Sequence, residues 1–228
     1  MLERARWLVT PVSGAFARVG ISADMVTGCC LCFGALAGAL VARGQFGLAA
    51  VALGIASIGD AIDGDLARAS GTVSPKGAIF DASADRYQEF FFLLGLAFFF
   101  RGDVVSLGLV LAALVGSFMV SYGSAKAEAL RVPVPGSAMR RAERAACFVL
   151  GTAFVAVLAE LVRWNVAPSW LTYTPILSAL ALVGVVSNVS AIYRLRTIGR
   201  SAEQTPFLDT PEMLNPGGFY EDELSAFK

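Results

Sequence analysis

Several stretches of this sequence are apolar over about the length that crosses a lipid bilayer. A helix needs about 20 mostly apolar residues to span the hydrocarbon core. Charged residues make up 16% of the chain, below the roughly 25% of ordinary soluble domains. The sequence therefore predicts an all-α integral membrane protein with six transmembrane helices. The apolar runs lie at roughly 24–42, 46–67, 79–100, 104–126, 145–163 and 169–193.

The segments that flank these runs predict two further regions. Residues 1–20 interleave apolar residues with arginines, as does an amphipathic juxtamembrane helix that lies on the membrane surface. Residues 201–228 read as a polar tail, which leaves residues 21–200 for the transmembrane domain. Most Lys and Arg residues outside the runs fall on the side that holds both termini. By the positive-inside rule, we expect both termini to be cytoplasmic in a cell membrane.

Composition excludes several kinds of site. The chain contains no histidine, so sites that depend on imidazole are excluded. Three of the four cysteines lie in one apolar run, which is typical of small buried side chains rather than of a zinc site. The formal net charge is zero, so the total charge says nothing about nucleic acid or acidic partners. We expect no nucleic-acid partner for this membrane protein.

Two aspartate-rich segments, GDAIDGDLARAS and GAIFDASADR, lie at the ends of the second and third apolar runs. Asp60 and Asp63 are three residues apart, and Asp81 and Asp85 are four apart, so each pair shares one face of a helix. The Gly and Pro residues in 69–76 turn the chain. We therefore expect two antiparallel helices whose ends bring the four carboxylates together.

Four carboxylates at a membrane boundary need cations. Oxygen ligands without His or Cys favour Mg²⁺ or Mn²⁺, and two ions that share carboxylates suit phosphoryl chemistry. The small residues Gly64, Ala67 and Gly77 lie on the same faces and leave room for a bulky ligand. Arg68 lies at the edge of that face and could clamp a phosphate oxygen. The pattern favours a site for a nucleotide pyrophosphate.

These residues also match a known pattern. Asp60-x-x-Asp63-Gly64-x-x-Ala67-Arg68, eight residues, then Gly77-x-x-x-Asp81-x-x-x-Asp85 resembles the signature of the CDP-alcohol phosphotransferase (CDP-alcohol phosphatidyltransferase) family, with every position filled. The resemblance implies six transmembrane helices after a juxtamembrane helix, surrounded by membrane lipid and often paired as a homodimer. It also implies an enzyme that transfers a phosphatidyl group from a CDP-linked lipid, CDP-diacylglycerol, to a polar hydroxyl acceptor and releases CMP.

The resemblance further implies roles for individual residues. Asp85 would be the general base that takes the proton of the acceptor hydroxyl. The metal ions would be held by Asp60, Asp63, Asp81 and Asp85. The CDP moiety would be contacted by Asp60, Gly64, Ala67, Arg68 and Gly77.

The acceptor is indicated by two further segments. SYGSAKAEA and MRRAERA resemble motifs of the family branch that includes phosphatidylinositol phosphate synthases. By position, an acceptor phosphate would contact Ser121, Lys126, Arg141, Arg144 and Arg194. Ser124 stands where the motif has Lys, and Lys126 stands where it has Arg, which loses bidentate geometry. We expect inositol phosphate or inositol as acceptor. Glycerol 3-phosphate is an alternative, and the arginines could instead anchor anionic lipid.

Two other classes of protein also use clustered carboxylates. An intramembrane prenyltransferase places paired Asp motifs and Mg²⁺ on a diphosphate, but Gly64, Ala67 and Arg68 favour the first interpretation. A divalent-cation transporter would carry acidic residues in the middle of several spans, whereas here they lie at the ends of two. Separately, Gly34 and Gly38 form a small-residue face that predicts either an internal helix seam or a dimer contact.

Overall fold

The protein is described here by a computed structural model that covers residues 22–70, 74–133, 136 and 138–204. All regular structure in these residues is helical, which confirms the predicted all-α class. The predicted juxtamembrane helix at 1–20 and most of the predicted tail lie outside the described residues. The helices are α2 (Ala23–Ala42), α3 (Phe46–Ser70), α4 (Pro75–Phe99), α5 (Val104–Ala129), α6 (Arg141–Arg163) and α7 (Thr174–Gln204), with a 3-10 turn η1 (Ser169–Leu171) before α7.

Side-chain caps fix where the helices near the aspartates begin. The hydroxyl of Ser22 accepts a hydrogen bond from the backbone N–H of Met25 at 3.2 Å and caps the start of α2. Ser74 caps α4 in the same way through the N–H of Gly77 at 3.0 Å. At the opposite end of the bundle, the carboxylate of Asp103 caps α5.

Five of the described helices are long and apolar enough to cross a membrane: α2, α5, α6, α7 with its preceding turn, and α3 as far as Asp63. The chain is therefore a multi-pass membrane protein. α4 is not among the five, because charged residues occupy its N-terminal half. α7 continues past the last apolar run and ends at Gln204.

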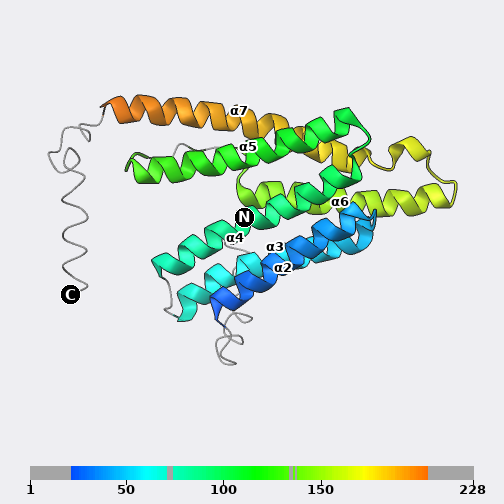
Figure 1. Cartoon of the computed structure of the whole chain (residues 1–228), viewed down its shortest axis with the longest axis horizontal. Coiled ribbons are helices and arrows are strands. Elements are labelled where there is room, and N and C mark those ends of the chain that lie inside the picture. Colours follow the sequence, from blue (N-terminus) through cyan, green and yellow to red (C-terminus); the bar gives the residue numbers. More distant parts are fainter. Residues whose placement is uncertain (1–21, 71–73, 134–135, 137, 205–228) are drawn as a thin grey trace.

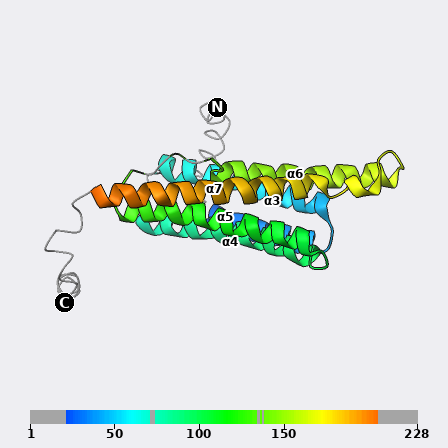
Figure 2. The same ribbon diagram turned by 90° about the horizontal axis from the view of Figure 1, so that it is seen from above.

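The helices form a closed ring. Each packs most extensively against two neighbours, in the order α2, α3, α6, α7, α5, α4 and back to α2. α5 lies beside α7 and α2 beside α3 in Figure 1, and the turned view in Figure 2 shows α4 beside α5. Fully buried side chains fill the centre of the ring, among them Phe92, Leu96, Leu180 and Val183.

α2 and α4 contact each other through their backbones. A Cβ atom added to Gly95 would lie 2.8 Å from the Cα of Gly38, and one added to Gly38 would lie 2.8 Å from the carbonyl carbon of Phe91. Gly34 faces the side chain of Gln88 in the same seam. The small-residue face at Gly34 and Gly38 therefore packs inside the chain, against α4.

Candidate active site

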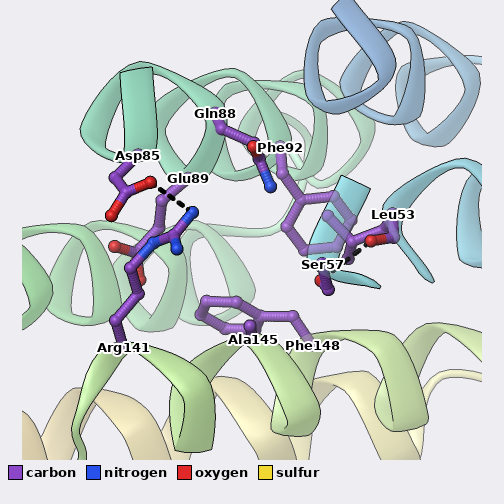
Figure 3. A pocket seen from close by; sticks show the side chains of 9 residues that line it. All are labelled: Leu53, Ser57, Asp85, Gln88, Glu89, Phe92, Arg141, Ala145 and Phe148. Carbon is purple, nitrogen blue, oxygen red and sulfur yellow. Dashed lines mark hydrogen bonds and ion pairs between the residues drawn. The ribbon is translucent and has the colours of Figure 1, made fainter. Parts of the chain in front are cut away.

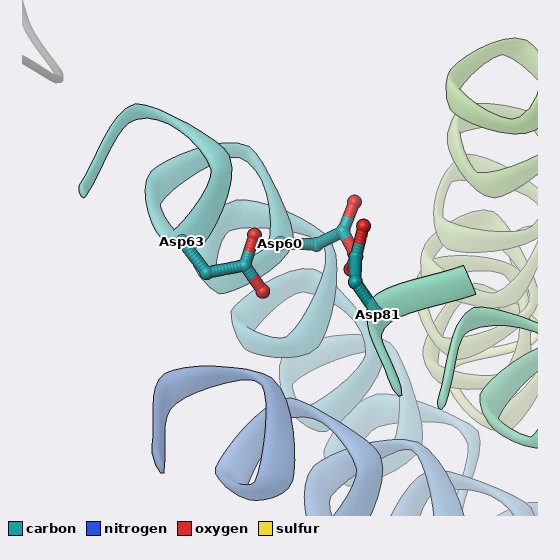
Figure 4. Close-up of side chains that lie close together, drawn as sticks. All are labelled: Asp60, Asp63 and Asp81. Atoms are coloured by element: carbon teal, nitrogen blue, oxygen red, sulfur yellow. The ribbon is translucent and has the colours of Figure 1, made fainter. Parts of the chain in front are cut away.

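Asp60, Asp63 and Asp81 gather where α3 ends and α4 begins (Figure 4). One carboxylate oxygen from each lies within 4.8 Å of the others. Oδ1 of Asp81 is buried and has no hydrogen-bond partner among the described residues. Closely spaced carboxylate oxygens, one of them buried and unsatisfied, fit a hard divalent cation such as Mg²⁺ or Mn²⁺. The predicted convergence of the two aspartate segments is confirmed for these three residues.

Thr27 of α2 holds one of these carboxylates. Its hydroxyl donates a hydrogen bond to Oδ2 of Asp63 at 2.7 Å, and Asp63 is only 4% exposed. The same hydroxyl lies 3.1 Å from the carbonyl of Ala23, one turn earlier. Hydrogen bonds of this kind orient a metal-ligating carboxylate. The sequence reasoning missed Thr27, because no spacing rule connects the first helix to the second.

Arg141, the first residue of α6, forms ion pairs with two aspartates. Its Nη2 lies 2.6 Å from Oδ1 of Asp85, and its Nη1 pairs with Oδ2 of Asp60. Figure 3 shows the link to Asp85 at one side of a small cavity of about 30 Å³, whose apolar lining includes Phe92 and Phe148. Asp85 is thus joined to the aspartate cluster through an arginine that we expected to contact the acceptor.

A larger cavity of about 310 Å³ opens beside the aspartates, between α4, α5, α6 and α7. Asp81, Asp85 and Glu89 line it from α4, and Ser121 and Ser124 line it from α5. Its basic side chains are Arg86, Arg140, Arg141, Arg144 and Arg194. The structure therefore brings four of the five predicted acceptor residues to one cavity. It adds two arginines that the sequence did not single out, Arg86 and Arg140. The carboxylates of Asp81 and Asp85 line the same cavity.

Lys126 is the predicted acceptor residue that does not line this cavity. Two residues along an α-helix correspond to about 200° of rotation, so Lys126 faces away from Ser124 and is exposed. The hydroxyl of Ser124 accepts a hydrogen bond from Nη1 of Arg194, which also donates to the carbonyl of Val120. Where the motif has Lys, this chain therefore has Ser124, whose hydroxyl accepts a hydrogen bond from Arg194.

Arg144 is 2% exposed and is held by Glu89 of α4. Its Nε and Nη2 donate to the two carboxylate oxygens at 2.8 and 3.0 Å, and its Nη1 donates to the carbonyl of Met139 at 2.9 Å. Glu89 lies four residues after Asp85 and so on the same helix face. That spacing could have identified Glu89 in the sequence, which the motif reasoning did not single out.

The predicted CDP contacts are only partly described. Gly77 lies in the first turn of α4, where an added Cβ atom would lie 3.2 Å from the hydroxyl of Ser74 and 3.5 Å from Oδ1 of Asp24. Its lack of a side chain thus also serves the cap of α4. Gly64, Ala67 and Arg68 belong to the last turns of α3, and their side chains lie outside the described part of the structure.

Comparison with known proteins places similar sequences in one enzyme family. A family model for CDP-alcohol phosphatidyltransferase matches residues 21–192. The phosphatidylinositol phosphate synthase of Streptomyces avermitilis is 30% identical over 216 residues, which cover 92% of this chain and 85% of that protein. The synthase of the same name from Cutibacterium acnes is 31% identical over 216 residues, which cover 89% of this chain and 100% of that protein.

Solved structures of a Mycobacterium tuberculosis phosphatidylinositol phosphate synthase share the fold. The crystal structure with CDP-DAG bound has a TM-score of 0.68 and 25% sequence identity, and the match covers 83% of this chain and 92% of that chain. The complex with manganese and citrate has a TM-score of 0.71 and 24% identity, and the match covers 85% and 90% of the two chains.

Proposed function

This chain belongs to the CDP-alcohol phosphatidyltransferase family, and on that premise we propose that it is a phosphatidylinositol phosphate synthase. It would transfer the phosphatidyl group of CDP-diacylglycerol to inositol phosphate and release CMP. The observation that carries the choice of acceptor is the arginine-lined cavity whose wall includes Asp81 and Asp85. A phosphorylated polyol suits that cavity, because the guanidinium groups can bind its phosphate. The carboxylates of Asp81 and Asp85 would then lie near its hydroxyl groups.

The aspartates divide the chemistry between them. Asp60, Asp63 and Asp81, together with Asp85, would hold two divalent ions, which when bound would stabilise the charge on the pyrophosphate and on the departing CMP. Asp85 would take the proton of the acceptor hydroxyl, since it lines the acceptor cavity. The hydroxyl oxygen then bonds to the phosphatidyl phosphorus as the bond to CMP breaks.

The remaining predicted contacts would position the two substrates. Gly64, Ala67, Arg68 and Gly77, with Asp60, would contact the CDP moiety. Arg141, Arg144 and Arg194 would surround the acceptor phosphate, with Ser121 at the same wall.

The family assignment and the distribution of Lys and Arg also support a proposal for how the chain lies in the membrane. α4 would be the sixth span, because it has 25 residues, its C-terminal half is apolar and it closes the helix ring. Its charged half would then lie at the cytoplasmic end with the aspartates, as the distribution of Lys and Arg predicts. Residues 1–20 would lie along that surface as an amphipathic helix, and the chain would pair as a homodimer in the membrane of the cell.

An acceptor screen tests the proposed reaction. Purified protein with labelled CDP-diacylglycerol and Mg²⁺ should release CMP with inositol 1-phosphate and much less with inositol, glycerol 3-phosphate or serine. Turnover with glycerol 3-phosphate alone would favour a phosphatidylglycerophosphate synthase, for which the same phosphate-binding cavity is the supporting observation. Turnover with none of the four acceptors would contradict both assignments.

The proposed roles of Asp85 and of the metal ions have their own test. Asp85→Asn should abolish CMP release while Mn²⁺-dependent binding of the CDP-lipid persists in part. EDTA should silence the wild-type protein, and added Mg²⁺ or Mn²⁺ should restore it. Undiminished turnover by Asp85→Asn would rule out the base, and activity in metal-free buffer would rule out the metal site.

A further inference from the structure

Arg141 stands between the aspartate cluster and the acceptor cavity. Its guanidinium pairs with Asp60 of α3 through one terminal nitrogen and with Asp85 of α4 through the other. The side chain is 31% exposed, and the two carboxylates are 20% and 16% exposed. One cation from α6 therefore bridges carboxylates of two other helices.

The guanidinium occupies one oxygen of each of two carboxylates that are proposed to hold the ions. Oδ2 of Asp60 and Oδ1 of Asp85 each face a nitrogen of Arg141. A divalent ion that bridges these aspartates requires oxygen ligands at about 2.0–2.1 Å for Mg²⁺, and its charge repels a cation held between them. The guanidinium and such an ion therefore exclude each other at these two oxygens.

A displaced Arg141 side chain has a place to go. Arg141 also lines the large cavity, where Arg86, Arg140 and Arg194 contribute further positive charge. A guanidinium that leaves the aspartates regains N–H donors, of which arginine has five. Turned into the cavity, these donors face the space proposed for the acceptor's phosphate.

We propose that Arg141 is the counter-cation of the metal-free site, that divalent ions displace it, and that the displaced guanidinium then binds the anionic group of the acceptor. The anion-binding half rests on the proposed function, and the metal half does not. Because the same side chain takes part in both events, metal loading strengthens anion binding, and anion binding strengthens metal loading by the same factor.

A metal titration without substrates tests the first half. Full-length protein in detergent is titrated with Mn²⁺, and free Mn²⁺ is followed by electron paramagnetic resonance. Arg141→Gln should bind Mn²⁺ about tenfold more tightly than the wild type, within the usual range for coupled sites. Arg140→Gln is the matched control, because Arg140 lines the same cavity but pairs with no aspartate in the described part of the chain. Its Mn²⁺ affinity should equal that of the wild type.

A second variant keeps the metal test decisive. Arg141→Lys retains one charge, which can pair with only one carboxylate at a time, so its Mn²⁺ affinity should lie between those of the wild type and Arg141→Gln. This variant decides the question where Arg141→Gln does not fold. Affinities for Mn²⁺ in the Arg141 variants that equal the wild-type value or fall below it would overturn the proposal.

The second half is tested with inorganic phosphate as the probe. In the wild type, Mn²⁺ should raise phosphate affinity about fivefold or more, and Arg141→Gln should lose most of that gain. Arg140→Gln should keep the gain even where its basal phosphate affinity is lower. An equal gain in the wild type and Arg141→Gln would refute the coupling. Neither titration contains a CDP-lipid or an inositol phosphate, so failure of the proposed reaction would appear separately in the acceptor screen.

Discussion

Replacing Thr27 by valine removes one hydroxyl from the metal site and leaves the shape of the side chain almost unchanged. The lost group donates a 2.7 Å hydrogen bond to a carboxylate that is 4% exposed, so water cannot readily replace it. A hydrogen bond to a charged group contributes about 1.5–3 kcal/mol, and about 1.4 kcal/mol is a tenfold change in an equilibrium constant. We therefore expect Thr27→Val to weaken Mn²⁺ binding by about 10- to 100-fold, the range found when a partner of a metal ligand is removed.

The assay compares Mn²⁺ dissociation constants of the wild type, Thr27→Val and Thr27→Ser in the absence of substrates. Thr27→Ser keeps the hydroxyl and should stay close to the wild type. In turnover assays, Thr27→Val should need a proportionately higher Mg²⁺ concentration for half-maximal rate, and saturating Mg²⁺ should restore most of that rate. The reasoning would be refuted by a wild-type Mn²⁺ affinity in Thr27→Val, or by equal losses in the Ser and Val variants.

Three other changes have expected outcomes. Arg144→Ala leaves a carboxylate of α4 without its countercharge, so we expect a loss of about 3–5 kcal/mol in unfolding free energy, measured by denaturation in detergent; an unchanged stability would show that the pair is not buried in solution. Gly38→Ala should destabilise by about 1–3 kcal/mol through overpacking. Gly54→Ala, where an added Cβ atom meets nothing within 4 Å, should keep the midpoint or raise it slightly, because alanine favours a helix more than glycine does. Equal losses in the two variants would argue against the seam. The hydrogen bond from the Ser106 hydroxyl holds the pKa of Asp103 below its ordinary value. The stabilisation from Asp103 is therefore present above the unfolded-state pKa of about 3.9 and is lost as pH falls through the lower folded-state pKa. Thermal midpoints from pH 6 to pH 3 should accordingly fall less for Asp103→Asn than for the wild type, and parallel curves would contradict this.

The features that the sequence could predict are those set by spacing along one helix. Apolar length placed the helices, and the three- and four-residue spacings placed aspartates on shared faces. Asp60, Asp63 and Asp81 meet as predicted, since α4 begins only five positions after α3 ends, which keeps the two helix ends close together. The small-residue face at Gly34 and Gly38 was also visible in the sequence, which left open whether it packs inside the chain or against a second copy.

The features that spacing along one helix could not predict are contacts between side chains of different helices. Thr27 reaches Asp63 from α2, and Arg141 reaches Asp60 across 81 positions. Which face of α2 or α6 contacts the aspartates depends on how the six helices pack around the ring. The spacing of residues within one helix does not determine that packing. For Lys126 the motif position predicted a contact with the acceptor phosphate. In the structure its side chain is exposed and does not line the cavity.

The backbone contact between α2 and α4 bears on more than helix packing. Asp63 is bound to α2 through Thr27, and Asp81 belongs to α4, so the lateral gap between those helices sets the distance between two of the metal ligands. That gap is fixed at Gly38 and Gly95. Gly38 lies 11 positions (38 minus 27) from Thr27, or about 16 Å along α2 at the usual rise of a helix. Gly38 and Gly95 each lie four residues before the end of their helix. The seam therefore sets the distance between these metal ligands from the end of the bundle opposite the aspartates, through glycines that have no side chain to move aside.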